Sequence, residues 1–259
     1  MHTDWRKPKV IESASRDVNP SEQDPRILLD ERLEDGTVIG WHAHGFAQWL
    51  QPVEGAITVF VQERCLVVPQ RFAAYIPAAC LHTVTSITDS SLKTLCVPDD
   101  ASRAHAMIGR APLGVGDGSG NDAGASALPS PLQDGPLVDA VRLLIEGVRL
   151  PQDRRARPIA FRLVNQPADV RTLRDWGEEL GASERTLNRI FRTEVGQGFR
   201  EWRRQLLVLQ TTALILAGLS VKQVAATLGY AAPSAFVAGF RSATGTTPSR
   251  FAAGIMAGD

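Results

Sequence analysis

Cysteine, long apolar runs and net charge are all scarce or absent in this sequence of 259 residues. The three cysteines, Cys65, Cys80 and Cys96, have a spacing that fits neither a disulfide framework nor a zinc knuckle, which indicates a reducing compartment. No run approaches the ~18 apolar residues of a membrane-spanning helix. The first residues also lack an apolar signal core. We therefore expect a cytoplasmic protein with no membrane partner.

The formal net charge of zero hides an uneven distribution. Residues 151–259 carry 15 Lys and Arg against 9 Asp and Glu, and 14 of these cations are Arg, whereas residues 1–150 carry 13 against 19. A guanidinium can bind two phosphate oxygens, or O6 and N7 of a guanine. The C-terminal part is therefore the candidate polyanion-binding region, although a solvated basic surface would have the same composition.

Composition changes along the N-terminal half predict three segments. Residues 1–25 are polar with little periodicity and are expected to form a disordered leader. Residues 26–108 contain short β-branched runs such as Ile57–Val61 and Leu92–Val97, separated by turn residues, which is typical of an antiparallel sandwich or small barrel. Residues 109–136 are rich in Gly, Ala, Ser and Pro and are expected to be a flexible linker.

Helical periodicity follows the linker. In residues 137–150 the apolar side chains recur at three- and four-residue steps, which predicts a connecting or dimerisation helix. Residues 151–259 show a helical pattern to their end. The predicted fold class is therefore α+β with two domains, an N-terminal β-barrel followed by an all-α domain.

Two stretches of the C-terminal part resemble each other. Each has a short helix, a Leu-Gly turn at Gly181 or Gly229, and a second helix that starts at Ser183 or at Pro233-Ser234. Glycine suits the positive φ that ends the first helix, and Ser or Pro suits the start of the second. This repeat predicts a tandem of two helix-turn-helix units.

The exposed sides of the two second helices are the candidate DNA contacts. The first offers hydroxyl, amide and guanidinium groups, which a helix in a major groove needs, at Ser183, Arg185, Thr186, Asn188, Arg189 and Arg192. The second offers mainly small side chains for methyl and phosphate contacts, at Ser234, Ala235, Ala238 and Arg241. Between the units, residues 199–217 predict a rigid helix of roughly 28 Å, at ~1.5 Å per residue.

These C-terminal motifs together resemble the DNA-binding domain of AraC/XylS-type regulators. The motifs are Thr172-Leu173, Ser183 to Arg192, Trp202-Arg203, Val224 to Tyr230, and Phe240 to Pro248. The resemblance implies that bases are faced by Arg185, Asn188 and Arg189 and, in the second unit, by Ser234, Ala235 and Ala238. The alanines depart from the polar residues of some family members. The implied partners are double-stranded DNA, an effector, RNA polymerase and a second copy of the chain.

Three histidines in the N-terminal part form a candidate metal site. His42 and His44 are two residues apart, which on a strand points both imidazoles to one face, and His82 follows later. With Gln48 they resemble the two motifs of a cupin barrel, although Gln48 replaces an acid and Ala79 stands where glycine is commoner. The resemblance implies an effector-sensing barrel in which Ni, Zn, Cu or Fe binds His42, His44 and His82, with Gln48 as a further candidate ligand.

Other uses of these residues stay open. The histidines would also suit hydrogen bonds in a metal-free sensor pocket, and Cys80 is either a soft ligand or a small buried hydrophobe. The favoured function is a non-enzymatic transcription regulator that responds to a small effector, with a metal ion such as nickel as a candidate and no certain cofactor. The alternatives are a metal-dependent cupin enzyme with an accessory helical domain, and a DNA-binding protein with a purely structural, dimer-forming barrel.

Overall fold

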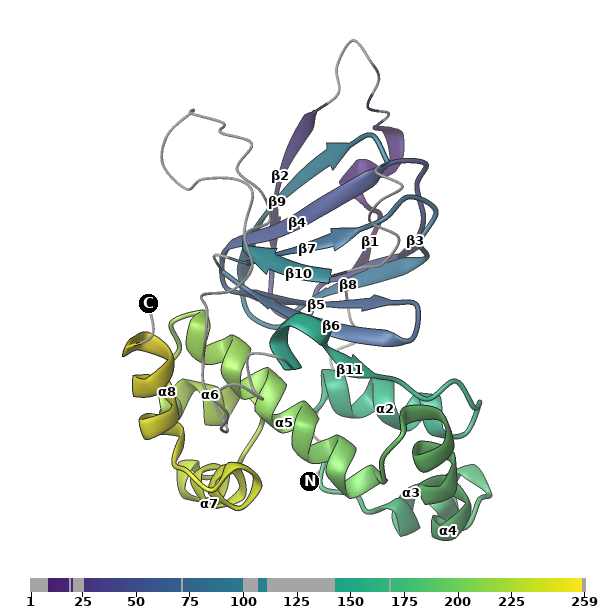
Figure 1. The fold of residues 1–259 in the computed structure, drawn as a ribbon, viewed down its shortest axis with the longest axis vertical. Coiled ribbons are helices and arrows are strands. Elements are labelled where there is room, and N and C mark those ends of the chain that lie inside the picture. Colours follow the sequence, from purple (N-terminus) through teal and green to yellow (C-terminus); the bar gives the residue numbers. More distant parts are fainter. Residues whose placement is uncertain are drawn as a thin grey trace. The chain divides into compact units, whose positions relative to one another are not determined.

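The chain forms two compact units. The computed structural model describes residues 9–18, 20, 26–70, 72–99, 107–110, 143–167 and 169–257. The first unit comprises residues 1–62 and 68–128, and the second comprises residues 63–67 and 129–259. Strands dominate the N-terminal part and helices the C-terminal part (Figure 1), which confirms the predicted α+β class.

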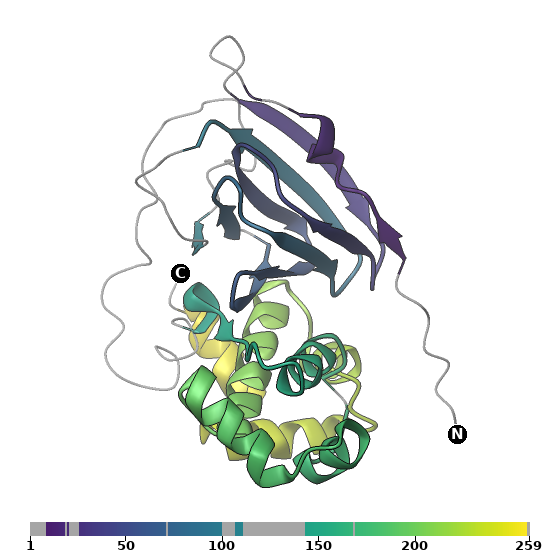
Figure 2. The ribbon, with the colours of Figure 1, turned by 90° about the vertical axis from the view of Figure 1, so that its right-hand side faces the viewer.

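The β-structure consists of two sheets that lie as two layers (Figure 2). One sheet has the strand order β1-β3-β8-β5-β6-β11, and the other has the order β10-β7-β4-β9-β2. The strands are β1 (Val10–Ile11), β2 (Ile27–Leu33), β3 (Val38–His42), β4 (Ala47–Glu54), β5 (Ala56–Val61), β6 (Arg64–Pro69), β7 (Phe72–Ile76), β8 (His82–Ser86), β9 (Ser90–Val97), β10 (Met107–Arg110) and β11 (Val148–Arg149).

Burial along the strands follows the predicted pattern. The apolar run Ile57–Val61 lies in β5, which is buried along its whole length, and Leu92–Val97 lies in β9. In β9 buried residues alternate with half-buried ones, because successive side chains of a strand point to opposite faces of the sheet. Both predicted runs are confirmed as strands, and their inward side chains form the core between the two layers.

The structure differs from the sequence prediction near the N-terminus. Val10–Ile11, expected in a disordered leader, form β1 and pair in parallel with Val38 and Ile39 of β3. Ala14–Asp17 form a short 3-10 helix, η1, whose start is capped by the Ser13 side chain. The leader prediction is therefore wrong for this segment, because pairing with a distant strand orders a stretch that has no local pattern.

The segments around the predicted linker also differ from the prediction. β10 reaches Arg110, two residues into the predicted linker of 109–136, and the rest of that linker lies outside the described residues. Within the helix predicted over 137–150, only residues 143–146 are described as helical. Gly147 has a φ of 66° and ends the turn, and Val148–Arg149 form β11 on β6. A Cβ at Gly147 would lie 2.3 Å from the Cys65 carbonyl oxygen, so only glycine allows this close approach.

The helical unit contains two helix-turn-helix pairs joined by one long helix. The pairs are α3–α4 and α6–α7, and the 18-residue helix α5 joins them (Figure 1). The bounds are α2 (Ala156–Asn165), α3 (Leu173–Leu180), α4 (Glu184–Ile190), α5 (Phe199–Leu216), α6 (Val221–Thr227), α7 (Pro233–Thr244) and α8 (Pro248–Ala257), with a π-helical turn η2 (Phe191–Val195) after α4. Within the described residues, none of the helices has the length and hydrophobicity that crossing a bilayer requires.

Two aromatic clusters hold the helix-turn-helix pairs. Trp202 of α5 is fully buried, with its ring 5.3 Å from that of Phe191, and its indole N–H donates to the Arg149 carbonyl at 2.8 Å. In the second pair Phe240 contacts the rings of Phe236 and Phe251 at 5.9 Å and 5.3 Å. Because α5 contacts elements of both helix-turn-helix pairs, it sets the separation of their second helices, α4 and α7, which we call the recognition helices.

Candidate nucleic-acid interface and metal centre

The turn between α3 and α4 is built by capping residues. Thr172 and Asp175 form a reciprocal capping box at the start of α3, and Gly181 ends this helix with a φ of 65°. A Cβ on Gly177 would lie 2.2 Å from the Ala182 carbonyl oxygen, so glycine lets the turn pack against α3. The Ser183 hydroxyl accepts from the Thr186 N–H at 3.1 Å and starts α4. These contacts set the direction in which α4 leaves the turn.

The recognition helix α4 presents three cations on one side. Arg185, Arg189 and Arg192 are exposed and follow one another at four- and three-residue steps. Among the described residues, no ion pair or hydrogen bond engages these three guanidiniums, whereas Arg171 and Arg174 around α3 pair with Glu179 and Glu178. A row of free donors on one helix face is what readout of a major groove requires.

Asn188 has a structural contact that the sequence did not predict. Its side-chain oxygen accepts from the Phe199 N–H at 3.0 Å and so caps the start of α5. A Cβ on Gly198 would approach the same oxygen to 3.1 Å, so the glycine leaves room for the cap. Ser183 and Thr186 likewise use their hydroxyls at the start of α4. Asn188, Ser183 and Thr186 thus hold the ends of α4 and α5 in place. Base contacts through these three residues stay a prediction.

The second helix-turn-helix pair, α6–α7, has the same architecture as the first but a different surface. Ser220 and Gln223 form a capping box on α6, and α7 begins with Pro233. Phe236 and Phe240 are buried beneath α7, which leaves its outer side to small residues and one cation, the exposed Ser234, Ala235, Ala238 and Arg241. The predicted division into packing and surface residues therefore matches the burial of α7, and the DNA contacts themselves stay a prediction.

The three predicted histidines come together in the N-terminal unit. Their ligand atoms lie within 4.8 Å of one another, with His82 buried and the other two half-buried. His42 pairs with His82 across β3 and β8, and the ring centroids are 4.2 Å apart. His44, however, lies beyond the end of β3, so the expectation that one strand carries both His42 and His44 is wrong. The bend at Gly45 returns the chain to β4, and His44 stacks on Phe46.

All three imidazoles are held in the same tautomer. Nδ1 of His42, His44 and His82 lies 2.8, 2.7 and 2.9 Å from the carbonyl oxygens of Gly40, Phe46 and Cys80. Each Nδ1 therefore carries the proton, and each Nε2 keeps a lone pair. Nε2 of His42 and His44 is buried without a hydrogen-bond partner among the described residues. Backbone carbonyls that fix the distal nitrogen are the usual support of metal-binding histidines.

Electrostatics favour the neutral form of His44 and His82. Burial lowers the pKa of His82 to about 3, and the neighbouring His42 and His44 add to this effect. Burial also lowers the pKa of His44. The amide nitrogen of Gln48 donates to Nε2 of His82 at 2.7 Å, and its buried oxygen has no partner among the described residues. The neutral, lone-pair-bearing form is the one that binds a metal ion.

The turn before His82 adopts the conformation in which glycine is commoner. Ala79 has a φ of 58°, and its N–H donates to the His44 carbonyl at 2.8 Å, which links the turn to the histidine cluster. Cys80 is a free thiol that accepts from Gln62 Nε2 at 3.4 Å, and burial raises its pKa. Its thiol is therefore not activated, and because Cys80 is only half-buried, both of its predicted uses stay open.

Comparison with known proteins finds a family match for the C-terminal part. A helix-turn-helix domain family matches residues 176–254. The HTH-type transcriptional regulator RipA of Corynebacterium glutamicum is 40% identical over 119 residues, covering 45% of this chain and 36% of RipA. The HTH-type transcriptional regulator NimR of Escherichia coli is 24% identical over 222 residues, covering 82% of this chain and 81% of NimR. The match thus spans about a third of the length of RipA.

Similarity to solved structures is low. ToxT from Vibrio cholerae aligns over 88% of this chain and 95% of its own, at 12% identity and a TM-score of 0.33. A cupin superfamily protein from Desulfitobacterium hafniense aligns over 30% of this chain and 72% of its own, at 10% identity and a TM-score of 0.28. The capped tandem pairs α3–α4 and α6–α7 and the matched family lead to the same assignment. Residues 176–254 therefore match the helix-turn-helix domain family, and in the same chain they follow the two-layered β-structure.

Proposed function

We propose that this protein is a sequence-specific, DNA-binding transcription regulator. The observation that carries the proposal is the row of exposed guanidiniums of Arg185, Arg189 and Arg192 on α4, which have no ion pair with any described residue, in a tandem helix-turn-helix domain. RipA and NimR, which are named as transcriptional regulators, support it. The cupin-enzyme alternative has no such support, because its acid position holds the neutral Gln48.

Single arginine variants test the DNA-binding proposal. On a duplex that the purified protein selects from a random library, Arg189→Ala should weaken binding by ~1–3 kcal/mol and relax the preference at one base pair. Arg241→Ala should weaken binding to selected and random duplexes alike, as a phosphate contact does. Arg174→Ala is the matched control, because Arg174 is exposed on α3 and already paired with Glu178. Wild-type affinity in all three variants would refute the proposed interface.

For the effector we propose a divalent transition-metal ion bound in the N-terminal unit. Three imidazoles have ligand atoms within 4.8 Å of one another, and Nε2 of His42 and of His44 is buried without a partner among the described residues. This arrangement fits a metal such as Ni, Zn, Cu or Fe. His42, His44 and His82 would hold the ion, and Gln48 would offer its buried oxygen as a further ligand. The bound ion would supply a positive charge and rigid cross-links between β3, β8 and the loop at His44.

Metal analysis combined with thermal shifts tests the effector proposal. Wild type should contain or bind one of these metals and gain thermal stability, since a ligand that binds only the folded state raises the melting temperature. The double variant His42→Ala/His82→Ala should lose the shift while keeping its strand and helix circular dichroism. Metal should also change the affinity for the selected duplex. A wild-type protein without a shift for any metal would refute a metal effector and leave an organic one.

A further inference from the structure

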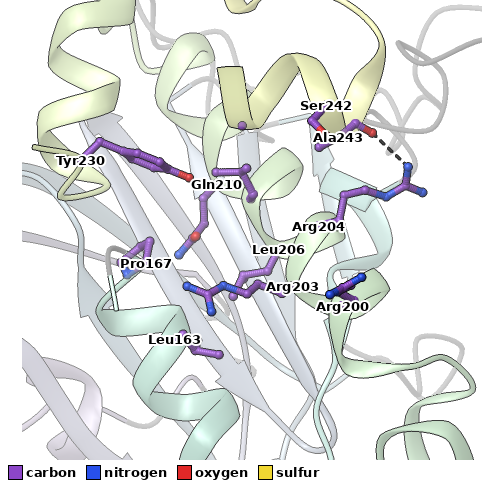
Figure 3. Close-up of a pocket in the computed structure, with 12 residues that line it drawn as sticks. Leu163, Pro167, Arg200, Arg203, Arg204, Leu206, Gln210, Tyr230, Ser242 and Ala243 are labelled. Atoms are coloured by element: carbon purple, nitrogen blue, oxygen red, sulfur yellow. Dashed lines mark hydrogen bonds between the residues drawn. The ribbon is translucent and has the colours of Figure 1, made fainter. Parts of the chain in front are cut away.

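A cavity lies in the helical unit, among α2, α5 and α7. It has a volume of about 280 Å³ and is lined by parts of α2, α5 and α7 together with the loop residue Pro167 and the turn residue Tyr230 (Figure 3). Small-molecule sites commonly measure ~300–1,000 Å³, so the cavity suits a small ligand. Leu163, Leu206 and Leu207 give it an apolar wall.

The cavity also has a cationic part on α5, beside Leu206 and Leu207. Arg200, Arg203 and Arg204 line the cavity, and no acidic side chain is among the described residues that do. Arg204 is engaged by the Ala243 carbonyl and by Glu201, whereas Arg200 is exposed and has no ion pair or hydrogen bond within the described part of the chain. The described lining residues therefore give the cavity a net positive charge.

Arg203 is the half-buried member of this group. Its two terminal nitrogens donate to the backbone carbonyls of Arg171 and Asp169, which fixes the guanidinium in place. Within the described residues, no carboxylate forms an ion pair with it. Burial lowers its pKa, and the more distant charge of Asp169 offsets this effect only in part. A fixed, desolvated cation without a paired anion attracts an anionic group strongly, because little solvent screens it.

Gln210 also lines the cavity. It is 2% exposed, and its amide nitrogen donates to the Val164 carbonyl at 2.7 Å. Its side-chain oxygen is buried and accepts no hydrogen bond from the described residues. Figure 3 shows Gln210 between the Tyr230 hydroxyl and the Arg203 guanidinium, on the same side of the cavity. A ligand there would satisfy Gln210 with a hydrogen-bond donor and the guanidinium with an anion.

We propose that this cavity is a second ligand site, within the DNA-binding domain, for a small hydroxy-substituted organic carboxylate. The carboxylate binds Arg203 and Arg200, the hydroxyl donates to Gln210, and the apolar body packs on the leucine wall. A phosphate of duplex DNA fits less well, because Arg203 is half-buried and one wall is apolar. Since the site touches α2, α5 and α7, an occupant alters the separation of the recognition helices and thereby the affinity for DNA.

Calorimetry on the full chain with four probes tests the proposal. Mandelate has the carboxylate, the hydroxyl and an apolar ring; phenylacetate lacks the hydroxyl, mandelamide lacks the charge, and inorganic phosphate lacks the ring. Mandelate should bind saturably, phenylacetate severalfold more weakly, and mandelamide at least tenfold more weakly. An absence of saturable mandelate binding overturns the proposal, and so does equal binding of phosphate, which would identify a simple anion site.

Variants locate the site and separate it from the metal proposal. Arg200→Gln should weaken mandelate binding at least threefold, while Arg174→Gln on α3, outside the cavity, should leave it unchanged. The His42→Ala/His82→Ala variant should bind mandelate like the wild type. Mandelate and the selected duplex should change each other's affinity by the same factor. If mandelate and the duplex cannot bind at the same time, Arg200 and Arg203 contact DNA phosphates instead, and the proposal is overturned.

Discussion

The side-chain amide nitrogen of Gln48 lies 2.7 Å from Nε2 of His82, and both residues are buried. Because Nδ1 of His82 donates to the Cys80 carbonyl, Nε2 is an acceptor and the amide must be the donor. The amide therefore occupies the lone pair that would bind a metal ion. Metal binding requires Gln48 to turn its unpartnered oxygen toward the ion or to move aside.

Gln48→Glu should strengthen metal binding at least tenfold. A carboxylate supplies an anionic fourth ligand beside three imidazoles, whereas the amide must first give up its hydrogen bond to His82. Without metal, the variant should be less stable by about 1–3 kcal/mol, because a buried carboxylate then faces a neutral imidazole. Metal titrations and denaturant unfolding measure the two effects, with Gln48→Leu as the control that removes the competing amide without adding a ligand. Unchanged metal affinity in the glutamate variant would mean that Gln48 does not face the ion.

Ala79→Gly should stabilise the N-terminal unit by about 0.5–1 kcal/mol. A left-handed conformation strains a residue that has a Cβ, and Ala79 holds a φ of 58° next to the histidine cluster. Glycine removes this strain and keeps the N–H that donates to His44. Denaturant unfolding of wild type and variant measures the difference.

The neighbouring substitution Ala78→Gly is the control for Ala79. Ala78 does not have a positive φ, so glycine there only increases the freedom of the unfolded chain and should lower stability by a few tenths of a kcal/mol up to about 1 kcal/mol. If both glycine variants lose the same stability, strain at Ala79 is not the reason for its unusual conformation.

Local signals explain how much of the helical unit was predictable. Gly181 and Gly245 end helices with positive φ, and Ser183 caps α4, as the turn chemistry of the sequence indicates. The apolar runs of β5 and β9 were likewise visible as β-branched stretches. Capping and periodicity act over a few residues, so a sequence displays them directly.

Contacts between distant residues explain what the sequence did not predict. β1 is ordered by β3, and Val148 leaves the helical pattern to pair with Cys65 of β6. The convergence of His42, His44 and His82 was predictable from a motif, but the position of His44 beyond its strand was not. The cavity at Arg203 and Gln210 also has no sequence signature, because its walls come from three helices.

Asn188→Ala separates structural support from base readout. The side-chain oxygen of Asn188 caps the N-terminus of α5, so its loss should destabilise the helical unit by about 1 kcal/mol. A cap alone leaves the preference for each base pair of the selected duplex unchanged, whereas the predicted base contact changes it at one base pair. Denaturant unfolding and a base-pair substitution series measure the two effects. A changed preference at one base pair with unchanged stability would instead make Asn188 a base contact.

Asp169→Asn should destabilise the helical unit in a pH-dependent way. Asp169 accepts hydrogen bonds from the backbone and side chain of Arg171, whose guanidinium lies 3.4 Å from the Trp176 ring centroid, and these bonds hold the pKa of Asp169 below its ordinary value. A carboxylate with a lowered pKa stabilises the fold above its unfolded-state pKa of ~3.9, and this stabilisation disappears as the pH falls through the folded pKa. The variant should therefore lose about 1–3 kcal/mol at neutral pH and progressively less below about pH 4.

Denaturant unfolding followed by helical circular dichroism, at neutral pH and in steps below pH 4, checks this prediction for Asp169. Asp30→Asn serves as the control, because the Asp30 side chain is 67% exposed and lies 3.9 Å from Lys93. Such an exposed pair contributes at most about 1 kcal/mol, so its variant should show little change at any pH. A loss at Asp169 that is the same at neutral and acidic pH would assign the effect to the shape of the 169–171 loop. A loss that fades with acid shows that the charge of Asp169 holds this loop, and with it the carbonyls that position Arg203.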